Sequence, residues 1–314
     1  MRKKICSILT ILTLLSICTV TFSTTSGSIK SSSEDGWYYL PEYPNYAQNG
    51  LPDFSQLQQK DWWGPKYPDL CGAVALVDIL WWFDSKHEDP KGFPGDGYDN
   101  YSLVSNYNSL DRPIPGPDQD DHNFNNVNDN RTSWHRFRKG GELIERFAWP
   151  AYKQKDALWS KLLGPLAGFY TQFKLYKDVK KWIKDAGLQD QYSVKMVFKP
   201  EFSFINERIR NNQGVMLTIG GYDSEVKPFG VFWGHCVAVA GINSSGEVAL
   251  SDPMRDRRNP SANPAEHNNA SIVSHDIYKV DLNSPWPKLS SFYIPDYCKE
   301  GVQVIYATVI SETE

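Results

Sequence analysis

The chain has 314 residues, of which 40% are hydrophobic and 14% aromatic, and its formal net charge at pH 7 is −4. This mildly acidic balance argues against nucleic acid as a partner, because proteins that bind nucleic acid present basic surfaces. The length is sufficient for one large domain or for two closely packed lobes.

The first residues predict a secretory leader. Residues 1–4 are basic, residues 5–22 are apolar but diluted by Ser and Thr, and residues 23–28 are small. This is the layout of a cleaved signal peptide, and the apolar run is short and hydroxyl-rich compared with the ~20 strongly apolar residues of a membrane span. An uncleaved N-terminal anchor is the alternative. Lipidation at Cys18 is disfavoured by the bulky Ile17 before it.

We therefore expect a signal peptide over residues 1–28, a Ser-rich linker over 29–36 and one domain over 37–314. The mature chain would be secreted and free of the membrane, and loss of the basic leader would take its formal charge from −4 to −7. The mature chain keeps an odd number of cysteines, so at least one thiol stays free in a monomer. These are Cys71, Cys236 and Cys298. A Cys236–Cys298 bridge would leave Cys71 free.

The pattern of elements along the chain predicts an α+β fold. Residues 37–69 are rich in Pro and aromatics and predict an extended arm, whereas residues 70–83 are apolar all round, as in a buried central helix. Residues 88–131 are rich in Asp, Asn, Pro and Gly and predict a long irregular excursion. Further helices are expected at residues 142–147, 176–186 and 202–211, and strands at residues 215–219, 231–240, 247–251 and 302–309. Helices that precede strands in this way favour a helical lobe and a sheet lobe.

Cys71 lies in the first turn of the predicted central helix, behind Asp69 at the N-cap position. The positive end of the helix dipole favours a thiolate there, and Gly72 leaves room for a substrate carbonyl. A structural cysteine in an apolar helix is the alternative.

His235 and Asp252 are expected to meet across a hairpin. His235 begins an alternating strand, residues 243–246 form an Asn- and Gly-containing turn, and the returning strand ends at Asp252. A carboxylate on the far nitrogen of a catalytic histidine fixes its tautomer and orientation. A core histidine and a turn aspartate before Pro253 are the alternative.

Together these segments resemble papain-like cysteine peptidases, which place the Cys, His and Asp of their triad in this order. The segments are Leu70–Ala73, Trp81–Asp84, Gly234–Gly241 and Ser251–Pro253. The cysteine segment is similar to bacterial immunoglobulin-degrading cysteine proteases, and the His-to-Asp segment resembles peptidases that process double-glycine leaders of bacteriocins. The resemblance implies a Cys-bearing central helix packed on an antiparallel sheet lobe that carries His and Asp.

The resemblance also implies a mechanism. His235 would act as general base for Cys71, a thioester would form, and Asp252 would orient the imidazole. The oxyanion needs a donor besides the Cys71 amide, and we expect Gln58 in this role, with Gln59 and Lys60 as alternatives.

Two other functions stay open: an acyltransferase of transglutaminase type, and a non-catalytic papain-like binding module. We expect a protein or peptide substrate, a monomer, and no cofactor. Residues 118–123 are rich in Asp and Asn and are a candidate calcium site, although they lack the glycine of an EF-hand loop. The chain contains no zinc-binding, nucleotide-binding or serine-hydrolase motif.

Overall fold

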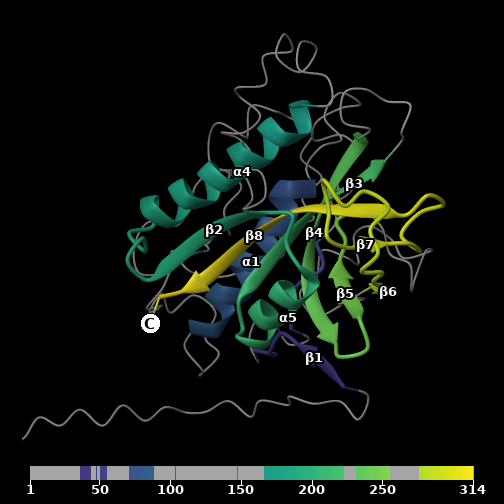
Figure 1. Cartoon of the computed structure of the whole chain (residues 1–314). Coiled ribbons are helices and arrows are strands. Elements are labelled where there is room, and N and C mark those ends of the chain that lie inside the picture. The colour runs from purple at the N-terminus through teal and green to yellow at the C-terminus, as the bar shows by residue number, and fades with distance from the viewer. Residues whose placement is uncertain are drawn as a thin grey trace, which may run out of the picture.

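An antiparallel sheet forms the centre of the part of the chain that the computed structural model describes, and helices pack against it (Figure 1). The described residues are 36–43, 47, 50–54, 71–87, 103, 147, 166–222, 231–254 and 276–313. Within them the sheet has eight strands, and the main path runs in the order β2-β8-β3-β4-β5-β6, with β1 paired to β4 and β7 to β8.

The strands are rich in β-branched and other apolar residues, which fit a buried pleated surface. Their bounds are β1 Trp37–Tyr39, β2 Tyr192–Phe198, β3 Gly214–Tyr222, β4 Val231–Asn243, β5 Glu247–Ser251, β6 Asp276–Lys279, β7 Tyr293–Ile294 and β8 Val302–Glu312. The predicted hairpin is present: Asn243 pairs with Glu247 and Ala238 with Ser251, with an irregularity between Val239 and Gly241.

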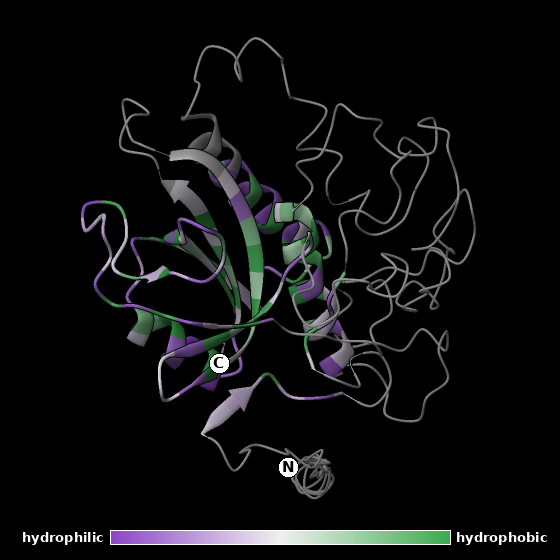
Figure 2. Cartoon of the chain, turned by 90° about the vertical axis from the view of Figure 1, so that its right-hand side faces the viewer, coloured by the Kyte–Doolittle hydropathy of each residue, from purple (hydrophilic) through white to green (hydrophobic). Residues whose placement is uncertain are grey.

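Helix α1, Cys71–His87, packs against β3 and β4, and its side chains from Ala73 to Ser85 are buried. This agrees with its apolar composition all round. Helix α4, Leu166–Asp185, packs against β2 and α1, and helix α5, Phe202–Arg210, packs against β3 and β4. In Figure 1, α1 lies behind the sheet and α5 in front of it, and Figure 2 shows hydrophobic residues along the strands of the sheet. No helix in the described ranges is long and apolar enough to cross a membrane.

The mixed helix and antiparallel-sheet class predicted from the sequence is confirmed, and several boundaries differ. Helix α4 begins ten residues before the predicted start at residue 176. The strands of the main sheet were expected only beyond residue 214, but β2 already precedes α5. The predicted arm contributes β1 and buried side chains such as Leu51 and Phe54. The predicted helix at 142–147 and the excursion at 88–131 lie outside the described residues except for Phe147 and Leu103. A separate helical lobe stays a prediction.

The start of β3 approaches α1 too closely for any side chain. A Cβ atom on Gly214 would lie 2.2 Å from the Cγ2 atom of Ile79, whereas a Cβ atom on Gly234 would have no neighbour nearer than 3.8 Å. Both glycines have backbone angles that other residues adopt. The glycine at 214 therefore sets the distance between the sheet and its central helix.

Gly214→Ala is expected to destabilise the protein by about 1–3 kcal/mol, because the added methyl forces Ile79 or the β3 backbone to shift. Urea unfolding followed by tryptophan fluorescence measures this change. Gly234→Ala is the matched control and should lose much less stability. Equal losses in the two variants would show that contact with α1 is not the cause.

Candidate active site

Cys71 is the first residue of α1, and its side chain is half-buried beside β4. Side-chain hydrogen bonds connect its thiol to both His235 and Cys236. The helix start, the histidine and a second thiol therefore meet at one point. The N-cap residue expected at Asp69 lies outside the described residues.

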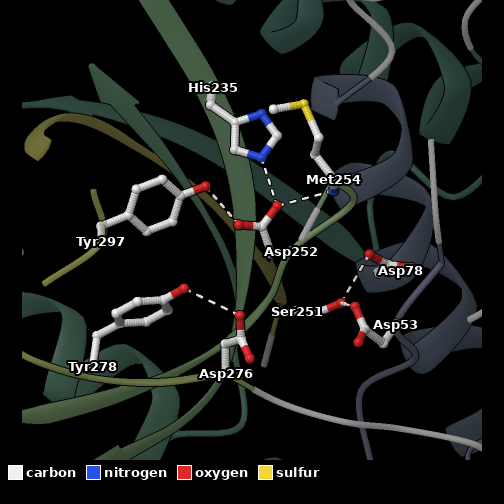
Figure 3. Close-up of polar contacts among 9 residues, drawn as sticks. All are labelled: Asp53, Asp78, His235, Ser251, Asp252, Met254, Asp276, Tyr278 and Tyr297. Atoms are coloured by element: carbon white, nitrogen blue, oxygen red, sulfur yellow. Dashed lines mark hydrogen bonds and ion pairs between the residues drawn. The ribbon is translucent and has the colours of Figure 1, made fainter. Parts of the chain in front are cut away.

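His235 and Asp252 are brought together by the β4–β5 hairpin. The Nε2 atom of His235 lies 2.7 Å from the Oδ1 atom of Asp252, and the two residues are 4% and 3% exposed. Asp252 follows the last residue of β5 directly, so its position depends on the hairpin register. Because Nε2 faces Asp252, the nitrogen left for Cys71 is Nδ1 (Figure 3).

Asp252 accepts two further hydrogen bonds. The Tyr297 hydroxyl donates to its Oδ2 atom at 2.5 Å, and the backbone amide of Met254 donates to Oδ1 at 3.0 Å (Figure 3). Tyr297 in turn packs against Tyr278, with ring centroids 5.3 Å apart and the ring planes tilted by 41°. The carboxylate is therefore held on both oxygens before any substrate binds.

Ser251, the neighbour of Asp252, is fixed by a second buried polar cluster (Figure 3). Its Oγ atom lies 2.8 Å from Oδ1 of Asp53 and 3.3 Å from Oδ2 of Asp78, and the Phe54 amide donates to the other oxygen of Asp78. Burial, together with the nearby Asp53 charge, raises the pKa of Asp78 well above its ordinary value. This favours a protonated Asp78, which removes the repulsion between two buried carboxylates. The cluster ties the N-terminal arm and α1 to the end of β5.

The histidine is strongly basic in this environment. Burial opposes its protonation, but the Cys71 charge and the hydrogen bonds to Asp252 and Cys71 outweigh burial and raise the pKa of His235 to about 10. For Asp252 burial acts in the opposite direction, and its contacts with His235, Tyr297 and the Met254 amide lower its pKa below the ordinary value. The pair therefore favours an imidazolium beside a carboxylate.

Cys236 completes the group of contacts around Cys71. Its sulfur accepts a hydrogen bond from the Nε2 atom of Gln172 at 2.7 Å. The contact with Cys236, followed by burial, raises the pKa of the Cys71 thiol, and His235 opposes both. The hydrogen bond from Cys71 is the largest cause that lowers the pKa of Cys236. The two thiols therefore shift in opposite directions: the pKa of Cys71 is raised and that of Cys236 is lowered.

All three cysteines expected in the mature chain are free, so the Cys236–Cys298 bridge considered from the sequence is not present. The oxyanion candidates Gln58, Gln59 and Lys60 and the candidate calcium segment 118–123 lie outside the described residues. In the ranges that the structure describes, no three His, Cys, Asp or Glu residues are grouped to hold a metal ion.

Sequence reasoning missed Gln172 and Tyr297. Gln172 continues the buried stripe of α4 that includes Leu175, Val179 and Ile183, so a polar residue at a core position of an amphipathic helix was the available signal. Its Oε1 atom is buried without a hydrogen-bond partner. Tyr297 comes from an irregular segment 45 positions beyond Asp252, and no local pattern marks it.

Comparisons with known proteins add little to this geometry. No known protein family and no curated protein matches the chain by sequence. Among solved structures, a Bacillus anthracis protein provisionally classed as a C39-like peptidase is similar at 16% identity and a TM-score of 0.20, over 33% of this chain and 55% of that one. The chain therefore spans about half the length of this neighbour. A likeness of this size does not decide fold or activity.

Replacing Asp252 by Asn is expected to lower the pKa of His235 from about 10 towards the ordinary 6.5, because both raising contributions of the carboxylate are lost. The raised pKa means that protonation of His235 stabilises the fold fully below pH 6.5 and that this stabilisation is lost as the pH rises through about 10. NMR titration of isotopically labelled histidines measures the pKa. The exposed Asp190→Asn is the control. An unchanged His235 pKa in Asp252→Asn contradicts the assignment.

Tyr297→Phe removes the donor to a buried carboxylate and is expected to cost about 1.5–3 kcal/mol of unfolding free energy. It should also raise the pKa of Asp252, since one of the contacts that lower it is lost. The stability difference from wild type should therefore be present at neutral pH and shrink as Asp252 becomes protonated at low pH. Urea unfolding at several pH values measures it. A pH-independent loss would point to ring packing alone.

Proposed function

We propose that the chain is a secreted, monomeric cysteine peptidase of papain-like type, with Cys71 as nucleophile, His235 as general base and Asp252 as the residue that orients it. One observation carries the proposal: a buried imidazole interacts with a helix-terminal thiol on one side and with a carboxylate, 2.7 Å away, on the other. A thiol paired with a base that a third group orients is the arrangement of covalent acyl transfer. Secretion is proposed on the leader pattern of residues 1–28.

Each residue has a definite step in this proposal. His235 takes the Cys71 proton at Nδ1, and the thiolate attacks the acyl carbon of a peptide bond. The imidazolium then protonates the leaving amine, and water releases the acyl group from the thioester with His235 again as base. Asp252 accepts a hydrogen bond from the Nε2–H group of His235 throughout the reaction and stabilises the imidazolium. The Cys71 backbone amide and the Gln58 side chain are the proposed donors to the oxyanion.

The Cys–His pair is tested by alkylation. Iodoacetamide at neutral pH should modify Cys71 faster than Cys298, a thiol of similar partial exposure whose sulfur donates to the Gly301 carbonyl oxygen. His235 is the neighbour that favours the Cys71 thiolate, and Cys71 is partly exposed whereas Cys236 is buried. Peptide mapping by mass spectrometry measures the extent of alkylation at each cysteine over time. His235→Ala should remove the difference, and equal rates for Cys71 and Cys298 in the wild type would refute the pair.

The activity itself is tested with a peptide library. The wild type should cleave peptides and incorporate isotopically labelled water into the new carboxyl group, whereas Cys71→Ala should be inactive. His235→Ala should be slower by about 10²–10⁴-fold, the usual contribution of general acid–base catalysis. Transfer of the acyl group to an added primary amine in preference to water would instead identify an acyltransferase. Peptide binding that persists in Cys71→Ala, without cleavage by the wild type, would identify a binding module.

A further inference from the structure

The second thiol of the site has no step in the proposed reaction, yet it touches the nucleophile. Cys236 is 2% exposed and follows His235 directly on β4, and its side chain hydrogen-bonds with that of Cys71. Its sulfur also lies 3.4 Å from the position that a Cβ atom on Gly72 would take, which places it against the first turn of α1.

The surroundings of Cys236 favour an anionic sulfur. Gln172, only 5% exposed, directs its amide N–H at the Cys236 sulfur. Thr218 lies opposite Cys236 on β3, and its nearby hydroxyl helps to lower the pKa of Cys236. Hydrogen bonds to a charged form stabilise that form. A buried thiol that only filled core volume would not need two polar neighbours. Cys298 lies elsewhere, with its sulfur directed at the Gly301 carbonyl oxygen.

We propose that Cys71 and Cys236 form a reversible disulfide on exposure to hydrogen peroxide, which switches the site off and protects the nucleophile from irreversible oxidation. The inference rests on the proposed function for its consequence, the loss of activity. Formation of the bond depends only on the two sulfurs. A disulfide requires the sulfurs to approach to about 2 Å. The Cys236 sulfur already lies against the first turn of α1, which begins at Cys71.

The chemistry balances with peroxide as the oxidant. The Cys71 sulfur, the more exposed of the pair, attacks one peroxide oxygen and becomes a sulfenic acid, while the other oxygen leaves as hydroxide and is protonated to water. The Cys236 thiolate then attacks the Cys71 sulfur and displaces hydroxide, which takes the remaining proton and leaves as a second water. In total, two thiols lose two electrons and two protons, and one peroxide becomes two waters.

The experiment treats the purified mature chain with hydrogen peroxide and maps its cysteines without reduction. Mass spectrometry should find the Cys71 and Cys236 peptides joined, with the loss of two hydrogen atoms. Iodoacetamide labelling of Cys71 should disappear and return completely after dithiothreitol, and peptidase activity should follow the same course.

Cys236→Ser is the informative variant. Before treatment, iodoacetamide should still label Cys71 in this variant. Peroxide should then convert Cys71 to sulfinic and sulfonic acids, which dithiothreitol does not reverse. Cys298→Ser is the matched control and should behave as the wild type. Absence of a Cys71–Cys236 peptide, or equal recovery of the wild type and Cys236→Ser, would overturn the inference.

The two proposals fail separately. A disulfide in a chain that cleaves no peptide would refute the peptidase and leave the redox pair standing. Cleavage that requires Cys71, without a disulfide, would refute the redox pair alone.

Discussion

The contact between His235 and Asp252 is the constraint on which the rest of the site depends. Both side chains are buried, and moving an ion into a protein interior costs several kcal/mol unless a partner and further hydrogen bonds compensate. Two further hydrogen bonds supply this compensation, because Tyr297 and the Met254 amide also donate to Asp252. A hairpin that slipped by one residue would leave both groups unpaired, so the register of β4 and β5 has a consequence beyond sheet stability.

The dipeptide His235–Cys236 connects this contact to the helix. Successive side chains of a strand point to opposite faces, so β4 can offer an imidazole to Asp252 and a thiol to the first turn of α1. Helix α1 packs against β4, and Cys71, its first residue, interacts with both His235 and Cys236. The approach of α1 is in turn set at Gly214 and by the cluster of Asp78 and Ser251. Packing away from Cys71 therefore decides whether Cys71, His235 and Cys236 come together.

Local sequence patterns were sufficient to predict the central helix and the hairpin of the site. The apolar run after Cys71 predicts a buried helix, and the Asn243–Gly246 turn predicts the hairpin that brings Asp252 to His235. The supporting residues could not be found in this way. Ser251 meets Asp53 from 198 positions away, and Tyr297 lies in an irregular segment, so only the folded chain brings them together. Strand β2 was missed because its side chains are mostly half-buried or exposed, which weakens the apolar signal.

The pKa of the Cys71 thiol also depends on a contact that its sequence position does not reveal. The start of a helix favours an anion by about 0.3–1 kcal/mol, and the effect fades within one turn. In the folded chain a second thiol touches Cys71, and that contact is the largest cause of its raised pKa. His235 acts on the same thiol in the opposite direction and lowers its pKa. The ionisation of Cys71 therefore depends on both neighbours, and replacing Cys236 is expected to change it even though the helix and the histidine remain.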